Sequence, residues 1–127
     1  MITGQCECGQ VAFEVDAVRD TVTVCHCSQC RRTSGHLWAS TVAPADTLRF
    51  TCDEGLSWYR SSDFAERGFC KVCGSSLFYR MDGDDTLAIA AGCLDTADEL
   101  TTGKHIFVKD KAGYYEIGDN APQFSKL

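Results

Sequence analysis

Cysteine is the residue through which this chain is best equipped to do chemistry, with nine in 127 residues. Cys70 and Cys73 belong to a Cys-x-x-Cys-Gly turn, which brings two sulfurs to one point and whose glycine tolerates a positive φ. Structural zinc is bound by four thiolates in a tetrahedron, so a second pair of cysteines is needed. Cys6 and Cys8 suit this role, because residues two apart on an extended chain point the same way. We therefore predict a closed structural zinc site formed by Cys6, Cys8, Cys70 and Cys73.

A second group of cysteines, Cys25, Cys27 and Cys30, lies within one short segment. Cys25 and Cys27 share one face at the end of a strand, with His26 on the other face. Cys30 falls in the first turn of a helix that has Ser28 as its N-cap, where free backbone N–H groups and the helix dipole favour thiolate over thiol. Three thiolates leave the fourth position of a zinc ion open, which is the arrangement of a catalytic metal. We predict a second, catalytic zinc at these three cysteines.

Other arrangements of the same residues remain open. A fourth protein ligand would close the second group, and the candidates are Cys52, Cys93, His36 and His105. The groups could also exchange partners, with Cys25 and Cys27 joining the Cys-x-x-Cys pair. Disulfides throughout are less favoured, because an odd count leaves one cysteine unpaired. Outside the two groups, Cys52 and Cys93 are expected to be small buried hydrophobic residues.

The histidines are expected to support the sites rather than to bind metal. His26 would pack beside the second metal, and His36 and His105 would make structural hydrogen bonds. His26 and His105 are also the only candidates for a general acid or base. Trp38 follows the predicted helix closely enough to form the wall of a pocket.

The charge pattern limits the class of ligand. The formal net charge is −6, and the basic residues are scattered, so the sequence predicts no nucleic-acid partner. Arg31 and Arg32 form the one tight basic pair. We predict that they bind a small anionic ligand, with Lys104 as a further candidate.

Period-two patterns predict a mainly β fold of small antiparallel sheets in a single domain, residues 1–127. A helix is expected over Gln29–Ser34, with Gly35 as its stop, and a short helical turn over Leu94–Leu100. Thr102-Gly103 is one of the expected turns. The expected strands are Val11–Val15, Thr21–Cys25, Leu37–Val42, Leu48–Cys52, Leu56–Arg60, Phe64–Phe69, Leu77–Met81, Leu87–Ala91 and Ile106–Lys109.

The expected location is the cytoplasm. The first residues show neither a basic region nor an apolar region of a signal peptide, and no run of about 18 apolar residues predicts a membrane span. Clustered cysteines in the reducing cytosol usually bind metal or do redox work.

With both groups placed, the sequence resembles the glutathione-dependent formaldehyde-activating enzyme family, which includes centromere protein V. The resemblance covers nearly the whole chain, and its most specific motif is the Cys-His-Cys-x-x-Cys-Arg-Arg run that begins at Cys25. The matching segments lie at residues 4–11, 25–35, 69–75, 94–95 and 104–108.

This resemblance implies the β-tent fold, a four-cysteine structural zinc and a three-cysteine catalytic zinc. It also implies a carbon–sulfur lyase that acts on S-hydroxymethylglutathione, the adduct of glutathione and formaldehyde, with a small thiol as its partner. Two other classes of function are weighed against it: a zinc-stabilised binding module without activity, and a redox protein with Cys52 or Cys93 as the reactive thiol.

Overall fold

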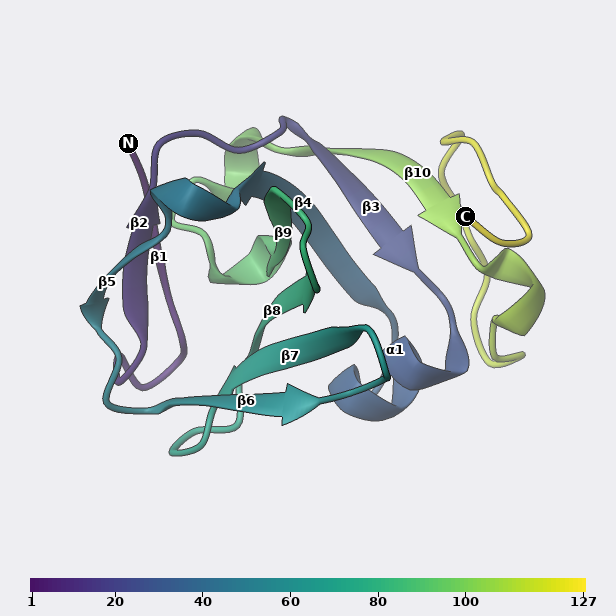
Figure 1. The fold of residues 1–127 in the computed structure, drawn as a ribbon. Coiled ribbons are helices and arrows are strands. Elements are labelled where there is room, and N and C mark those ends of the chain that lie inside the picture. The colour runs from purple at the N-terminus through teal and green to yellow at the C-terminus, as the bar shows by residue number, and fades with distance from the viewer.

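Two β-sheets form the structure, a computed structural model that describes residues 1–127 (Figure 1). The smaller sheet has the order β1-β2-β5, with bounds β1 Ile2–Gln5, β2 Ala12–Val15 and β5 Arg49–Cys52. The larger has the order β10-β3-β4-β9-β8-β7-β6, with bounds β3 Thr21–Cys25, β4 Trp38–Pro44, β6 Leu56–Arg60, β7 Ala65–Cys70, β8 Ser76–Met81, β9 Thr86–Ala90 and β10 Thr101–Ile106. The prediction of a mainly β fold is confirmed.

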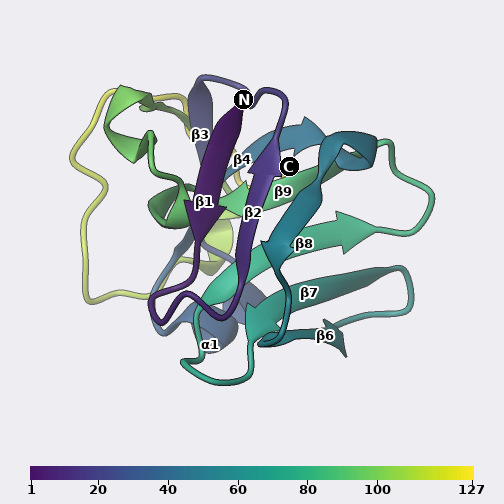
Figure 2. The ribbon, with the colours of Figure 1, turned by 90° about the vertical axis from the view of Figure 1, so that its left-hand side faces the viewer.

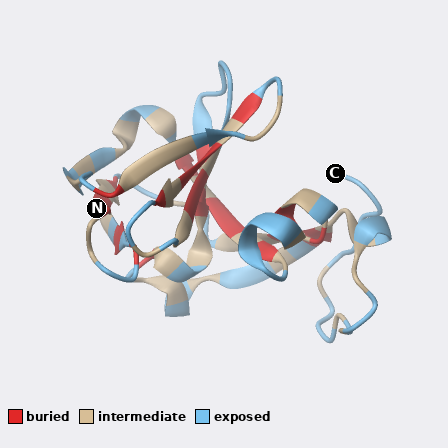
Figure 3. Ribbon diagram, turned by 90° about the horizontal axis from the view of Figure 1, so that it is seen from below, coloured by how far each residue is buried: buried red, intermediate tan, exposed pale blue.

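The hydrophobic core lies between the two sheets. Figure 2 shows the three-stranded sheet in front of β8 and β9 of the larger sheet. Phe13 of β2 meets Phe78 of β8 edge to face, with ring centroids 5.0 Å apart, and Ile89 of β9 belongs to the same buried cluster. Buried residues accordingly concentrate in the strands, and the surface of the helix is largely exposed (Figure 3).

The opposite face of the larger sheet is not part of this core. Because side chains alternate along a strand, Ser40 and Val42 of β4 point to one side while Thr41 and Ala43 point to the other. Ala43 is in the core cluster, whereas Ser40 and Val42 line a cavity together with Ala88 of β9. The alternating side chains of β4 therefore face the hydrophobic core on one side of the sheet and the cavity on the other.

The helix α1 (Ser28–Ser34) connects β3 to β4 and ends at Gly35, whose φ of 89° is the left-handed conformation expected of a glycine stop. Its N-cap is Cys27, not Ser28 as predicted, because the Cys27 sulfur accepts the hydrogen bond from the Cys30 backbone N–H. The expected helical turn at Leu94–Leu100 contains a 3₁₀ turn over Ala97–Glu99, and the other 3₁₀ turns are Ala45–Thr47, Ala91–Cys93 and Val108–Asp110. No helix has the length and apolar content needed to cross a membrane.

The last strand differs from the prediction. Ile106–Lys109 is not a strand: β10 ends at Ile106, and Phe107 has a left-handed φ of 54° before the final 3₁₀ turn. Gly103, predicted as a turn, lies inside β10 at an irregularity of the register. A Cβ there would lie 2.8 Å from the Cβ of Thr21, so glycine allows β10 to approach β3 closely. These two strands pair in parallel, the one parallel pair among the paired strands.

Strand β1 was absent from the prediction. It is short, and Gly4 interrupts its pattern of side chains. A Cβ at Gly4 would lie 2.6 Å from the Phe13 ring, so the glycine makes room for a core aromatic residue. What specifies β1 is its pairing with the neighbouring strand β2, and a local sequence pattern does not show such a contact.

Candidate metal centres and active-site cavity

The first group of cysteines lies where the tips of the two sheets meet. Cys6 and Cys8 come from the turn between β1 and β2, whereas Cys70 is the last residue of β7 and Cys73 lies in the turn between β7 and β8. The four sulfurs lie within 4.8 Å of one another, and Cys8 Sγ is 3.7 Å from both Cys6 Sγ and Cys70 Sγ. A tetrahedral zinc with Zn–S of about 2.3 Å requires sulfur–sulfur edges of about 3.8 Å, so this group could hold such a metal.

Backbone and hydroxyl groups satisfy the sulfurs of this group. The N–H of Val11 donates to Cys6 Sγ at 3.3 Å, and the N–H of Cys73 donates to Cys70 Sγ at 3.4 Å. Hydrogen bonding from Ser75 lowers the pKa of Cys73 to about 5. The sulfurs of Cys6 and Cys8 converge in a turn and not on an extended strand as expected, because β1 ends at Gln5.

The second group of cysteines gathers where β3 passes into α1. Cys25 is the last residue of β3, Cys27 is the N-cap of α1, and Cys30 lies in its first turn. Their sulfurs lie within 4.8 Å of one another and could hold a metal ion. The Cys30 N–H donates to Cys27 Sγ at 3.3 Å, whereas the sequence argument expected the helix N–H groups to act on the Cys30 sulfur.

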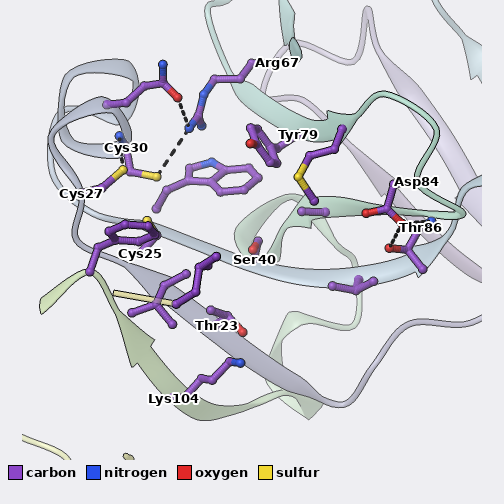
Figure 4. Close-up of a pocket in the computed structure, with 18 of the residues that line it drawn as sticks. Thr23, Cys25, Cys27, Cys30, Ser40, Arg67, Tyr79, Asp84, Thr86 and Lys104 are labelled. Carbon is purple, nitrogen blue, oxygen red and sulfur yellow. Dashed lines mark hydrogen bonds between the residues drawn. The ribbon is translucent and has the colours of Figure 1, made fainter. Parts of the chain in front are cut away.

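Arg67 of β7 is the cation beside this group, and sequence analysis missed it. Its Nη2 donates to Cys30 Sγ at 3.6 Å and to Gln29 Oε1 at 3.1 Å (Figure 4). Hydrogen bonds from Cys25 and, to a smaller extent, from Arg67 lower the pKa of Cys30 to about 6. The contact between Cys25 and Cys30 raises the pKa of Cys25. An arginine two residues after Ala65, and so on the same face of an alternating strand, was the signal that could have revealed Arg67.

The second group opens on a cavity of about 440 Å³ on the free face of the larger sheet. Figure 4 shows the three cysteines together at one end of it, with Asp84 and Thr86 at the other. Trp38 lines the cavity, as predicted, and Tyr79 of β8 lies beside Arg67.

No fourth protein ligand joins the second group. Neither His36 nor His105 belongs to it, and Cys52 and Cys93 are half-buried residues whose thiols donate to the backbone carbonyls of Gln10 and Ala90. The exchange of partners between the two groups is also wrong, and all nine cysteines are free of disulfides. Burial raises the pKa of Cys93 to about 12, which is the opposite of what a reactive thiol requires.

The histidines form a buried hydrogen-bonded chain behind the second group. His26 is 2% exposed, with Nε2 2.9 Å from Nδ1 of His105 and Nδ1 bonded to the hydroxyl of Tyr115. His105 is 5% exposed and its Nε2 lies 3.0 Å from both carboxylate oxygens of Asp119. The supporting roles predicted for His26 and His105 are confirmed. Neither residue lines the cavity, so the structure does not favour either as an acid or base there.

The C-terminal segment holds both ends of the loop that carries the three cysteines. Tyr115 bonds to His26 between the first two cysteines, and the hydroxyl of the adjacent Tyr114 lies 2.6 Å from Nδ1 of His36, just beyond α1. The predicted structural hydrogen bond of His36 is thus present.

Arg31 and Arg32 do not line the cavity. Both belong to α1, whose buried residue is Cys30, and Arg32 is exposed. The cations that do line it are Arg19, Arg67 and Lys104, from three other parts of the chain. The role predicted for Arg31 and Arg32 in ligand binding stays a prediction, and the geometry favours these three residues instead.

Comparisons with known proteins agree with this architecture. A family model described as "Glutathione-dependent formaldehyde-activating enzyme" matches residues 1–110. An uncharacterized lyase of Schizosaccharomyces pombe is 27% identical over 131 residues, which cover 96% of this chain and 89% of that protein. The crystal structure of a Rhodobacter sphaeroides protein has the same fold, with a TM-score of 0.64, 22% identity, and coverage of 95% of this chain and 98% of the other. The chain belongs to the family of glutathione-dependent formaldehyde-activating enzymes.

Proposed function

We propose that this protein is a zinc-dependent carbon–sulfur lyase acting on the adduct of a small thiol with formaldehyde, with S-hydroxymethylglutathione as the leading substrate. The observation that carries the proposal is the three-cysteine group at the end of a cavity of about 440 Å³, a volume in the usual range of small-molecule sites. The description of the family and the lyase name of the yeast relative support the same class of reaction.

Zinc fits both groups, because each offers only thiol ligands and each sulfur set is close enough for one ion. Cys6, Cys8, Cys70 and Cys73 would fill all four positions of a structural zinc. Cys25, Cys27 and Cys30 would fill three positions of a catalytic one. When bound there, zinc supplies a Lewis acid that favours the thiolate form of a substrate sulfur, both as nucleophile and as leaving group.

The protein's own residues prepare this site in three ways. The positive charge of Arg67 offsets the negative charge of the thiolates through its bond to Cys30 Sγ. Trp38 and Tyr79 form apolar walls that limit water near the sulfurs. Arg19 and Lys104 line the cavity as cations for the carboxylates of glutathione, in the role first expected of Arg31 and Arg32.

The test is exchange spectroscopy with isotope-labelled formaldehyde and glutathione, which form the adduct slowly without a catalyst. Zinc-loaded protein should increase the rate of exchange between free formaldehyde and the adduct. Cys27→Ser, which removes one proposed ligand of the second zinc, should return the rate to that of the uncatalysed reaction. An uncatalysed rate with fully zinc-loaded wild-type protein would refute the proposed activity and favour a binding module.

The proposed location is the cytosol. Nine free thiols, two groups of which need to stay reduced to bind metal, support a reducing compartment. Fractionation of cells that express the tagged protein tests this directly, and recovery in an oxidising compartment would contradict it.

A further inference from the structure

Two side chains beside the three-cysteine group carry buried hydrogen-bond donors without partners. Arg67 is 6% exposed and Trp38 is 7% exposed, and both line the cavity. Nε and Nη1 of Arg67 and Nε1 of Trp38 are buried and have no acceptor. Buried polar groups are almost always hydrogen-bonded, so unpartnered donors at the wall of a cavity indicate an acceptor that the cavity receives.

Arg67 has donors to spare. A guanidinium group has five N–H donors, and the two known bonds of Arg67, to Gln29 and to Cys30, both use Nη2. The rings of Trp38 and Tyr79 lie 5.6 Å and 4.9 Å from its Cζ atom, and aromatic rings attract the charge but do not accept the remaining N–H groups in the plane of the guanidinium. The charge is therefore held in an apolar setting, where an oxygen acceptor is bound more strongly than in water.

The place of these donors limits the chemistry of the acceptor. Arg67 Nη2 is 3.6 Å from Cys30 Sγ, and the unpartnered Nε and Nη1 belong to the same guanidinium group, so an oxygen bound there lies near the position of a sulfur held at the three-cysteine group. Such an oxygen must be separated from that sulfur by only two or three bonds. The oxygen of an S-hydroxymethyl group meets this condition, because it is two bonds from sulfur, whereas the carboxylates of glutathione are much farther from its thiol.

We propose that Arg67 and Trp38 form an oxygen subsite that binds the carbonyl-derived oxygen of the thiol adduct, an inference that rests on the proposed lyase function. In cleavage, R–S–CH₂–OH loses its hydroxyl proton to solvent, the carbon–oxygen bond becomes double, and the carbon–sulfur bond breaks with its electron pair on sulfur. The products are thiolate, formaldehyde and a proton. The oxygen carries negative charge as its proton leaves, and the donors of Arg67 and Trp38 stabilise that charge.

The experiment compares small probes in titration calorimetry with zinc-loaded protein. Mercaptoacetate has oxygens three bonds from sulfur, ethanethiol has the same length without them, and acetate has the oxygens without sulfur. We expect mercaptoacetate to bind at least about tenfold more tightly than ethanethiol, because one buried hydrogen bond to a charged donor changes a binding constant by at least about that factor. Arg67→Met should abolish this preference, and Trp38→Phe, which removes one N–H and keeps an aromatic ring, should reduce it severalfold.

Arg49→Met is the matched control, since it removes an exposed arginine that pairs with Glu14 and Asp16 and does not line the cavity. It should leave the preference for mercaptoacetate intact. Zinc content is measured for each variant, and Trp38→Phe keeps the test valid if Arg67→Met loses metal. The same Trp38→Phe protein should show a lower kcat for adduct cleavage with an unchanged affinity for glutathione.

The outcomes separate the two proposals. If ethanethiol binds but oxygen-bearing probes gain nothing that depends on Arg67 and Trp38, the oxygen subsite is refuted and the lyase proposal stands. If acetate binds through Arg67 but no thiol binds, Arg67 is an anion site only, and both the subsite for the thiol adduct and the lyase proposal are refuted. Binding of none of the three probes refutes both.

Discussion

The two cysteine groups use the same kind of ligand in very different surroundings. The first joins two turns that are far apart in sequence, and Cys8 and Cys70, 62 residues apart, are direct neighbours. The second lies within one loop between β3 and α1 and faces a cavity. A metal at the first would connect the two sheets, whereas a metal at the second would connect only residues that are already close.

The two groups also differ in the hydrogen-bond donors that surround their sulfurs. The donors to the first group are backbone N–H groups and Ser75, which hold the sulfurs and offer nothing to a ligand. The second group adds a charged side chain, Arg67, with donors left unpartnered at the cavity wall. Ligand type therefore does not distinguish the proposed structural site from the proposed catalytic site. The number of sulfurs and the charged side chain beside them do.

The largest expected effect is the loss of the first group. Cys70→Ser should leave the chain largely unfolded, because structural zinc contributes about 10–16 kcal/mol of apparent binding energy in small zinc domains and ordinary domains are stable by only about 5–15 kcal/mol. Near-ultraviolet circular dichroism and thermal melting report the loss. A cooperative melt close to that of the wild type would show that the two sheets hold together without this metal.

Loss of the second group should have a smaller effect on the fold. We expect Cys27→Ser to melt cooperatively and to contain about one zinc per chain by elemental analysis, against about two for the wild type. The comparison would fail if Cys27→Ser and Cys70→Ser unfolded equally, because both groups would then be structural.

The pH dependence of the metal-free protein should also distinguish the second group. The pKa of Cys30 is lowered from 9.0 to about 6, so its thiolate stabilises the fold fully above pH 9 and this contribution is lost as pH falls through 6. Ultraviolet absorbance of thiolates should show a transition near pH 6 that is absent in Cys30→Ser. In Arg67→Met its midpoint should move to higher pH, and an unmoved midpoint would exclude Arg67 as a cause.

The smallest expected effect concerns the C-terminal segment. Tyr115→Phe removes the hydroxyl that bonds to buried His26, so the loop of the second group should lose order and bind zinc roughly tenfold more weakly. Competition with a chromophoric chelator measures this affinity, and zinc in the first group should be unaffected.

Tyr114→Phe is the matched control for that measurement. Tyr114 is 65% exposed and bonds to exposed His36, so its change should alter the affinity by no more than about twofold. Equal effects of the two changes would show that the buried chain of histidines does not position the metal loop.

The sequence by itself determined the two sets of cysteines, the mainly β class and the helix after the second group. Each of these depends on short-range spacing: Cys70 and Cys73 share a turn, Cys25 and Cys27 flank a residue that points away, and Gly35 ends a helix. Where local spacing gave a wrong prediction, a residue close in space but distant in sequence was the reason. Gly103 was predicted as a turn because the close approach of Thr21 is not visible in the sequence. The strand was therefore predicted at Ile106–Lys109, whereas β10 spans Thr101–Ile106.

Only the tertiary structure decided what surrounds the second group. Arg67 reaches Cys30 across 37 residues, and Tyr115 reaches His26 across 89. Arg31 and Arg32 are close to the cysteines in sequence yet do not line the cavity, whereas Lys104 lines it because β10 pairs with β3. Coordination by adjacent cysteines is fixed by a few backbone angles and can be deduced from the chain. The charges and donors that face the cavity come from separate strands, and their meeting depends on the pairing and curvature of the whole sheet.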